Sequence, residues 1–350
     1  MNHPSPDPRF VTRRTILART VSALSSAALV SSGCAPAVRE WHATLHPYRR
    51  YQQRESTKGV LTARFFGTTS VLFEDATTKI LSDGFVTRPG LLQVAFGRLQ
   101  SNEQRVKETL ARLGLDSLDA VFTGHSHYDH AMDAPLIAKK TGAVLIGSKS
   151  TQNIALGAGL PEGRTRVVAN GDSHRCGSFE LTFIESAHSR PEPWPGTIGA
   201  PLVTPAPARK WKTGGTWSVL IRHHDATTDT ARTLLVHGSA NHCGDALRGR
   251  RAEVVYLGIG GLGLQSDTFV DEYWQTVVRT VQAKRVILVH WDDFFAPLEP
   301  LRPFPPLLAF ANAIRRIRRH ARADDVQVFL PVPWRRVDPF AGLSRPKDVA

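Results

Sequence analysis

The sequence predicts a single α/β domain. From about residue 59 onward, short apolar runs typical of buried strands alternate with amphipathic patterns typical of helices. Of the 350 residues, 41% are hydrophobic, which is ample for one core. Several histidines and a carboxylate cluster directly after one of the apolar runs, where a strand of an α/β sheet ends and such proteins bind ligands.

The first half of the domain opens with three short strand-like runs. The expected strands are residues 61–66, 70–74, 79–82, 118–122 and 143–146, and the expected helices are 101–113, 131–140 and a short one ending near 156. Gly114 and Gly142 follow two of these helices, in the position where glycine caps a helix C-terminus.

The second half repeats this alternation. The expected strands are residues 179–184, 216–222, 233–237, 253–257, 285–289 and 326–330, and the expected helices are 267–282 and 307–319. Residues 189–215 form a long insertion rich in proline and glycine, interpreted as a wall or lid of a pocket with Trp194 and Trp211 as apolar contacts. The alternative is an irregular surface loop.

The most informative stretch is the histidine cluster after the strand over residues 118–122. His125 and His127 are two residues apart, so in an extended segment their imidazoles project to the same side and can bind one divalent cation. Asp129 and His130 follow as the chain turns into a helix, and can face a second cation. Imidazole with a carboxylate suits zinc or a related transition metal.

This His-x-His-x-Asp-His pattern after a strand resembles the signature of the metallo-beta-lactamase superfamily. The resemblance covers roughly residues 59–335 and implies a four-layer αββα sandwich. It also implies that His188 completes a first metal site with His125 and His127, and that His290 joins Asp129 and His130 in a second. Asp83 stands where the family often has an aspartate that orients a metal-bound histidine; alternatively, it only begins a turn before Gly84.

One position departs from the family pattern. The residue expected to bridge two metals is an aspartate, but Ser239 stands there and supplies no negative charge. A two-metal centre would therefore lack this bridging charge, and His237, His242 or Cys243 are alternative ligands nearby. Residues 258–263 match a dinucleotide-binding glycine pattern, but the strand that follows ends in a histidine and not in the required acid. Nicotinamide binding is set aside.

The N-terminal segment is interpreted as a targeting signal. Residues 1–33 resemble a twin-arginine export signal, and the sequence ending at Cys34 resembles a lipoprotein cleavage site, although Ser31 is a poor match; cleavage near residues 35–37 is the alternative. Residues 34–58 are expected to be a linker or arm, 59–335 the domain, and 336–350 a loose tail. The expected location is the periplasmic face of a bacterial membrane, with lipidated Cys34 as the anchor.

The formal charge of +13 permits an anionic substrate or membrane surface, or has no role beyond solubility. We expect no nucleic-acid partner, because no nucleic-acid module is present and the protein is expected to be exported. Cys176 and Cys243 are expected to be free thiols. The oligomeric state is left open.

The resemblance implies hydrolysis by a metal-activated water, with Asp129 orienting or deprotonating that water. One or two Zn²⁺ ions are expected, with Mn²⁺ or Fe²⁺ as alternatives. Tyr128 within the motif resembles a branch that includes phospholipase D-type phosphodiesterases and sugar-lactone hydrolases. The substrate is therefore expected to be a small or lipid-like phosphodiester, lactone or ester. The alternatives are a mononuclear iron oxidoreductase of the same fold and a non-catalytic metal-binding protein.

Overall fold

The structure is a computed structural model that describes residues 61–224, 231–304 and 307–344. The expected signal, the linker and Cys34 lie outside the described residues. Within those ranges, every helix is too short or too polar to span a bilayer. Cys176 and Cys243 are both free, as expected.

The observed elements follow the predicted alternation closely. The strands are β1 (Thr62–Phe65), β2 (Val71–Glu74), β3 (Lys79–Ser82), β4 (Ala120–Phe122), β5 (Val144–Gly147), β6 (Thr165–Val167), β7 (Ser173–Cys176), β8 (Phe179–Glu185), β9 (Trp217–His224), β10 (Ala231–His237), β11 (Val254–Gly258), β12 (Arg285–Val289) and β13 (Gln327–Phe329). The helices are α3 (Leu91–Phe96), α4 (Glu103–Leu113), α5 (Tyr128–Ala131), α6 (Ala134–Thr141), α7 (Lys149–Gly157), α8 (Asp267–Trp274) and α9 (Leu307–Ala323), with short turns η2 (Glu162–Arg164), η3 (Ala208–Lys210), η4 (Leu262–Leu264) and η5 (Gln275–Arg279).

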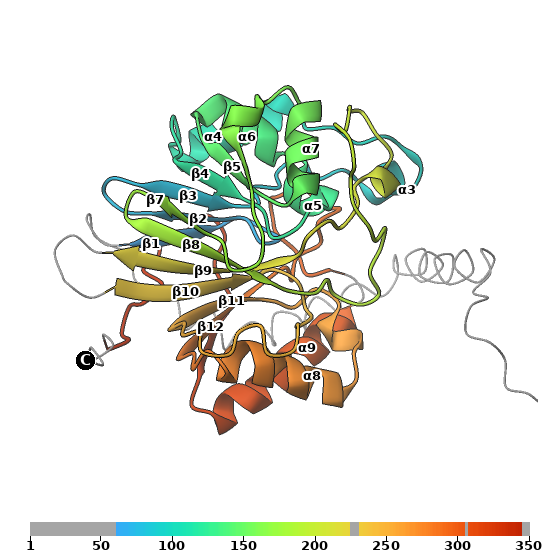
Figure 1. The fold of residues 1–350 in the computed structure, drawn as a ribbon. Helices are drawn as coiled ribbons and strands as arrows, with labels where there is room; N and C mark the ends of the chain where they lie inside the picture. The colour runs from blue at the N-terminus through green and yellow to red at the C-terminus, as the bar shows by residue number, and fades with distance from the viewer. Residues whose placement is uncertain (1–60, 225–230, 305–306, 345–350) are drawn as a thin grey trace, which may run out of the picture. The chain divides into compact units, whose positions relative to one another are not determined.

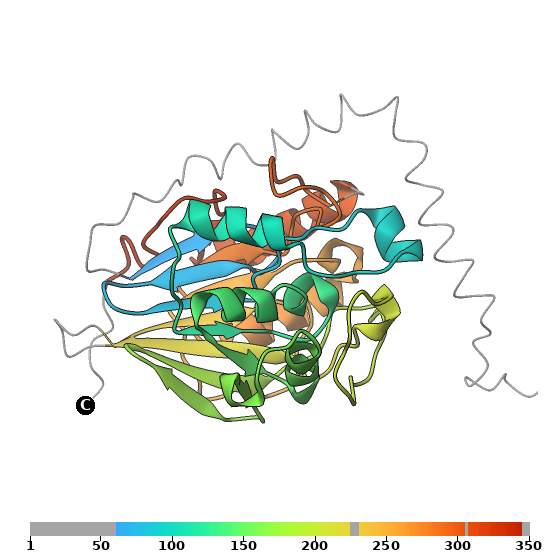
Figure 2. The same cartoon turned by 90° about the horizontal axis from the view of Figure 1, so that it is seen from above.

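The strands form two sheets of related design. One sheet has the order β1-β2-β3-β4-β5-β6, and the other has the order β13-β12-β11-β10-β9-β8-β7. Each begins with an antiparallel meander and continues with parallel strands. Helices α4, α6 and α7 cover the outer face of the first sheet, and α8 and α9 cover that of the second (Figures 1 and 2). The expected α/β class and four-layer αββα sandwich are confirmed.

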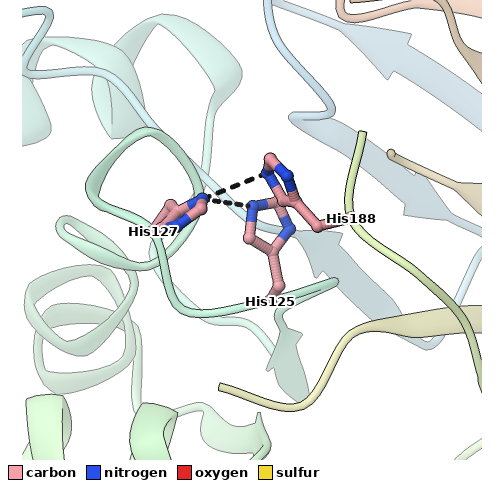
Figure 3. A group of neighbouring side chains, drawn as sticks. All are labelled: His125, His127 and His188. Atoms are coloured by element: carbon pink, nitrogen blue, oxygen red, sulfur yellow. Dashed lines mark hydrogen bonds between the residues drawn. The ribbon is translucent and has the colours of Figure 1, made fainter. Parts of the chain in front are cut away.

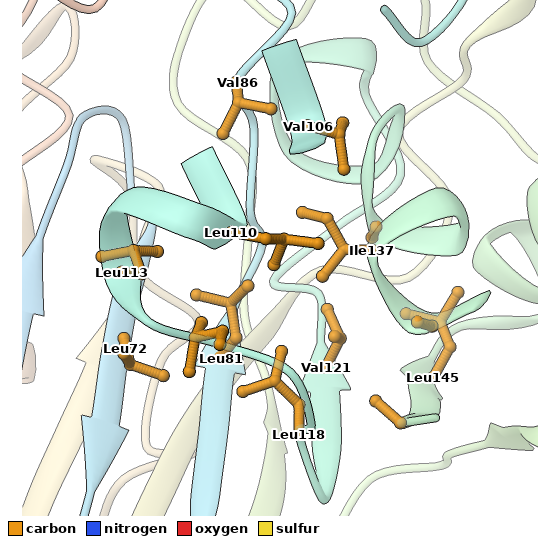
Figure 4. Packing of buried hydrophobic residues seen from close by; sticks show 14 of the residues in the cluster. Leu72, Leu81, Val86, Val106, Leu110, Leu113, Leu118, Val121, Ile137 and Leu145 are labelled. Carbon is orange, nitrogen blue, oxygen red and sulfur yellow. The ribbon is translucent and has the colours of Figure 1, made fainter. Parts of the chain in front are cut away.

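The packing of α4 shows why the first outer layer forms. Asn102 caps the helix by accepting a hydrogen bond from the Arg105 amide at 3.0 Å, and Gly114 ends it in the left-handed region. Three apolar residues at helical spacing, Val106, Leu110 and Leu113, face the sheet. They pack there against side chains of α6 and the first sheet, including Ile137, Leu81 and Val121 (Figure 4).

Three departures from the predicted elements have physical reasons. The helix expected over residues 131–140 is two helices, because Pro135 in the first turn of α6 cannot continue α5. The helix expected over 267–282 is regular only as α8 and continues in the wider turns of η5. The tail is not loose from its start, since the backbones of Val337 and Ala63 pair, and the Arg285 guanidinium donates to the Ala341 carbonyl at 2.6 Å.

Candidate metal centre

The histidine cluster lies on the loop between β4 and α5. This loop is held on two sides. The Gly124 amide donates to Asp83 Oδ1 at 2.9 Å, and the Ser126 amide donates to the Thr213 carbonyl in the insertion at 2.9 Å. Helix α5 begins directly after His127, so Asp129 and His130 project from its first turn. The loop and short helix thus present their side chains in different directions from one rigid base.

The first group of ligand atoms consists of three imidazoles. His125 Nε2 lies 3.2 Å from His127 Nδ1, and His127 Nδ1 lies 3.1 Å from His188 Nε2. His188 follows β8 of the second sheet, whereas the other two follow β4 of the first. Figure 3 shows the three rings pointing toward one another. All three donor atoms lie within 4.8 Å of one another.

The second group joins a carboxylate to two imidazoles. Asp129 Oδ2 lies 3.4 Å from His130 Nε2 and 3.3 Å from His290 Nε2, and the two imidazole nitrogens are 3.2 Å apart. His290 directly follows β12 of the second sheet. The sandwich therefore brings together, in two groups, the four residues of the sequence motif and the two further histidines that the family resemblance implies as ligands.

The spacing of these atoms fits a transition-metal site. Imidazole nitrogens bind zinc at about 2.0–2.1 Å, and a tetrahedral arrangement then places neighbouring donor atoms roughly 3.3–3.4 Å apart. Both groups have separations close to this value, between 3.1 and 3.4 Å. Imidazole and carboxylate donors also match zinc, manganese or iron chemistry. The residues present fit one metal ion in each group.

The first group is kept neutral by its surroundings. Burial lowers the pKa of the His125 imidazole well below its usual value, and the neighbouring histidines lower it further. Burial also lowers the pKa of His127 to about 3. Burial lowers the pKa of His188 as well. Three neutral imidazoles offer lone pairs to a cation without first having to lose a proton.

The second group has the opposite electrostatics. Burial alone would lower the pKa of His130, but the carboxylates of Asp129 and Asp83 outweigh it and raise that pKa to about 10. Burial alone would raise the pKa of Asp129, but His130 and His290 hold it well below its usual value. In the metal-free protein this group therefore contains a carboxylate beside an imidazolium.

Hydrogen bonds outside the two groups orient several of the rings. Asp83 Oδ2 lies 2.7 Å from His130 Nδ1, which leaves His130 Nε2 directed into the second group. His127 Nε2 lies 3.1 Å from Thr213 Oγ1, which in turn donates to Glu192 at 2.5 Å. Asp83 therefore has the contact expected of an orienting carboxylate, whereas the chain through Thr213 to Glu192 has no signal in the sequence.

The segment around His290 is held in an uncommon backbone conformation. His290 has a φ of 54°, and its amide donates to the Thr68 carbonyl at 2.6 Å. Asp292 accepts from the Thr68 amide at 2.7 Å and forms a fully buried ion pair with Arg88 at 2.6 Å. Asp292 therefore helps to hold the backbone segment that carries His290.

The glycine-rich loop after β11 makes room for this histidine. A Cβ atom at Gly260 would lie 3.0 Å from His290 Nδ1, and one at Gly258 would lie 2.2 Å from the Gly238 carbonyl oxygen. Glycine is needed at both positions because other parts of the chain approach so closely. Gly260 therefore leaves room for the His290 ring, and Gly258 leaves room for the backbone that follows β10.

The alternative ligands after β10 lie outside both groups. His237 is buried, with Nδ1 2.7 Å from Ser218 Oγ and Nε2 donating to the Asn241 carbonyl at 2.7 Å, so both ring nitrogens are occupied. The His242 ring is tilted against that of Phe269, with ring centroids 5.7 Å apart, and its Nε2 lies 3.8 Å from Glu272. Neither they nor Cys243 contribute an atom to the two groups. Ser239 is buried beside Tyr273, whose hydroxyl lies 3.5 Å from the Ser239 carbonyl oxygen.

Asn241 is a functional candidate that the sequence pattern does not reveal. Its side-chain amide donates to the His188 carbonyl at 2.7 Å, which fixes the segment after β8 against the loop after β10. The signal that could have found it is its place three residues after a glycine at the end of a parallel strand. The loop after β10 has no bridging aspartate, but its Asn241 holds the backbone of the ligand His188.

The insertion forms one wall of the centre. The Trp194 ring lies 6.2 Å from the His127 ring and 6.1 Å from the Tyr128 ring. Phe294 completes this aromatic side, 5.4 Å from the His290 ring. Trp211, expected to contact a ligand, is instead buried in the core. A polar pocket of about 400 Å³ opens beside His188, lined also by Arg190 and Glu192.

Comparisons with known proteins agree with this geometry. A family model described as the metallo-beta-lactamase superfamily matches residues 63–248, more than half of the chain. Over 107 residues the chain is 31% identical to a UPF0173 metal-dependent hydrolase from Anaeromyxobacter sp. (strain K), and the match covers 30% of this chain and 39% of that protein. The chain thus spans less than half the length of this curated relative.

Two solved structures share the fold. Igni18, described as a novel metallo hydrolase from the archaeon Ignicoccus hospitalis, aligns with a TM-score of 0.51 and 15% identity, over 79% of this chain and 97% of its own. A protein described as a possible metal-dependent hydrolase from Veillonella parvula aligns with a TM-score of 0.51 and 17% identity, over 80% and 99%. At these identities the likeness concerns the fold alone.

Proposed function

The chain belongs to the metallo-beta-lactamase superfamily, and from that premise we propose that it is a metal-dependent hydrolase of a phosphodiester, a lactone or another ester. The observation that carries the proposal is the pair of converging ligand groups, one of three imidazoles and one of a carboxylate with two imidazoles. A largely buried cluster of metal-ligating side chains is uncommon without a metal or a catalytic role.

We propose zinc as the metal, held by His125, His127 and His188 and by Asp129, His130 and His290. Bound zinc supplies Lewis acidity and lowers the pKa of water. The chain's own contribution is positional. Asp129 remains a carboxylate because His130 and His290 lower its pKa, so it can accept a hydrogen bond from, and a proton of, a water placed between the groups.

The surroundings of the centre support a substrate with both an apolar and a polar part. Trp194 and Phe294, which are partly buried, offer aromatic faces on the side of His127 and His290. On the side of His188, the pocket is polar and is lined by Arg190 and the buried Thr213. A phosphodiester or ester that carries an acyl or alkyl chain would match both, and a lipid-like phosphodiester is the preferred candidate.

The experiment is a substrate panel on the purified, zinc-loaded protein. The panel contains a phosphodiester, a lactone and a carboxylic ester, each with a short and a long apolar chain. Hydrolysis that is lost in Asp129→Asn but kept in Asp75→Asn supports the proposal, since Asp75 is bonded to His223 far from the centre. Absence of turnover on every substrate after zinc, manganese and iron loading would contradict it.

Two alternatives are separated by the same preparation. An iron oxidoreductase would show oxygen uptake after Fe²⁺ loading and no hydrolysis. A non-catalytic metal-binding protein would retain stoichiometric metal with neither reaction. Elemental analysis of each preparation, run beside the activity assays, distinguishes an inactive holoprotein from a failed metal loading.

We also propose export to the periplasmic face of a bacterial membrane, with residues 1–33 as signal and Cys34 as the lipid-bearing residue. The support is the resemblance of these residues to a twin-arginine and lipoprotein-type signal. Mass spectrometry of the mature N-terminus is the test. A diacylglyceryl-modified Cys34 supports the proposal, and a mature chain that begins elsewhere contradicts the lipid anchor.

A further inference from the structure

Helix α3 turns its apolar face away from the protein. Leu92 is 73% exposed and Phe96 is 81% exposed, and their spacing of four residues places them on one side of the helix. Leu91 and Ala95 are exposed beside them. Only Val94 packs inward, at 8% exposure. An exposed Leu-Phe pair on one helical face is uncommon in a protein that has no partner there.

The helix is fastened to the insertion that walls the metal centre. The backbones of Leu99 and Ala206 pair, with hydrogen bonds of 2.7 and 3.0 Å. Arg98 Nε donates to the Pro205 carbonyl at 2.9 Å. Both views place α3 and the insertion at the same end of the sandwich as α5, which carries part of the ligand cluster (Figures 1 and 2).

The core beneath α3 continues toward the centre. Val94 belongs to the same buried cluster as Phe85, Tyr128 and Trp211, with Trp194 packed against it. Phe85 and Tyr128 meet edge to face with ring centroids 6.0 Å apart. The exposed face of α3 is therefore supported by side chains that also contact the histidine loop.

The only charged side chains in the segments that form this face are positively charged. Residues 84–102 and 193–217 contain no aspartate or glutamate. Arg98, next to α3, and Arg209 and Lys210 on η3 are exposed. Apolar side chains surrounded by exposed cations match a surface that is both apolar and anionic, as the headgroup region of an anionic bilayer is.

We propose that α3 and η3 form a docking surface for an anionic membrane, with Leu92 and Phe96 inserted among the lipids and Arg98, Arg209 and Lys210 facing the headgroups. The proposal is independent of which bond the metal centre cleaves. It would bring the aromatic side of the centre close to the lipid surface, where a lipid-like substrate is found.

A second copy of the chain fits this face less well. In a twofold contact the same surface meets itself, so Arg209 and Lys210 would approach their own counterparts. Like charges at short range oppose such a contact. A membrane with anionic headgroups has the complementary charge and also accepts the apolar pair.

Vesicle binding tests the proposal. The full chain carries Cys34→Ser in every sample, so that no lipid can be attached. Binding to vesicles of phosphatidylglycerol and phosphatidylcholine is measured by co-sedimentation for the parent and for Leu92→Ser/Phe96→Ser. We expect the affinity of the double variant for these vesicles to be lower by about tenfold or more. The matched control is Leu264→Ser on η4, which replaces a leucine that is 68% exposed elsewhere and should leave binding unchanged.

The charge contribution is tested in parallel. Arg209→Glu/Lys210→Glu should weaken binding to the anionic vesicles several-fold and leave binding to pure phosphatidylcholine unchanged. Arg166→Glu/Arg175→Glu makes the same change of charge on the edge strands β6 and β7 and should have a much smaller effect.

Hydrogen exchange locates the contact without reference to the N-terminal residues. Addition of anionic vesicles should slow exchange in residues 91–98 and leave residues 262–270 unchanged. Unchanged exchange in residues 91–98 would overturn the proposal. So would a dimer that dissociates in Leu92→Ser/Phe96→Ser while vesicle binding stays constant, because the face would then belong to a second copy.

Discussion

The two ligand groups are built from similar side chains but differ in charge. The first consists of three buried imidazoles whose pKa values are lowered, that of His127 to about 3. The second has a carboxylate within it, and a further carboxylate, Asp83, behind His130, whose pKa is raised to about 10. The groups are adjacent, since His125 and His130 have ring centroids 3.9 Å apart.

Because of this difference, one group supplies neutral donor atoms for a metal ion and the other supplies the negative charge that offsets it. The first group offers lone pairs at no cost in protons but gives no negative charge to offset a divalent cation. The second offers that charge but must first lose a proton from His130. With Ser239 at the position where the family resemblance implies a bridging acid, Asp129 within the second group and Asp83 behind His130 would have to offset the charge of both metal ions. We expect the groups to bind metal with different affinity and pH dependence.

Removing a ligand from the first group should have the largest effect on metal binding and hydrolysis. In His127→Ala we expect one metal equivalent to be lost and hydrolysis to fall roughly 10³-fold, because a bound metal contributes several kcal/mol to such a reaction. Elemental analysis with the kinetic assay measures both. His223→Ala, which removes an imidazole paired with Asp75, is the control. Retention of both equivalents in His127→Ala would show that the first group is not an independent site.

Weakening the support of the second group should have an intermediate effect. Asp83→Asn keeps the shape of the side chain but removes the charge behind His130, and we expect a loss of roughly 10–100-fold in affinity for the second metal. A competitive chelator titration measures it. Asp75→Asn is the control, because it alters a similar carboxylate–histidine pair outside the two groups, in which Asp75 Oδ2 lies 2.9 Å from His223 Nε2. It should leave both metal affinities unchanged. Equal weakening at both groups would mean that they act as one.

Introducing a carboxylate at position 239 should change the metal affinity of the second group. Ser239→Asp adds a negative charge near the centre, and we expect about tenfold tighter binding of the second metal. Ser239→Asn, nearly the same in size but neutral, separates the effect of charge from that of packing. If the two variants bind metal alike, Ser239 does not occupy the bridging position.

Proton release should distinguish the groups without any mutation. At pH 8 the first group is already neutral, because its pKa values lie below the usual value, so loading it should release almost no protons. His130 is protonated below about pH 10 in the metal-free protein, so loading the second group should release about one proton. Calorimetry in buffers of different ionisation enthalpy measures the number. Equal release from both groups would contradict the assigned electrostatics.

The sequence carries most of the information for the fold and for the ligand set. Strands such as β4 and β12 are short apolar runs. His290 comes directly after β12, and two residues separate His125 from the end of β4, so the positions of these ligands follow from strand ends. Four ligands lie within residues 125–130, which makes the cluster visible in the sequence. The pairing of His188 and His290 with it depended on the family resemblance.

The elements that escaped prediction lack the usual pattern of burial. Helix α3 buries only Val94 and exposes its larger apolar residues, which is the reverse of an ordinary amphipathic helix. Strand β7 is a polar edge strand, and β6 has two exposed residues of three. The chain from His127 through Thr213 to Glu192 depends on the path of an irregular insertion, and no local pattern predicts such a path.

The placement of the ligands across both sheets has a consequence for how the protein holds together. Within each group at least one ligand comes from the first sheet and one from the second, separated by 61 residues between His127 and His188 and by 160 between His130 and His290. Occupied groups would act as cross-links that close long loops, the part that disulfides play in many exported proteins. The described residues contain no disulfide. Loss of metal should therefore loosen the scaffold itself, so that chelation lowers thermal stability together with activity.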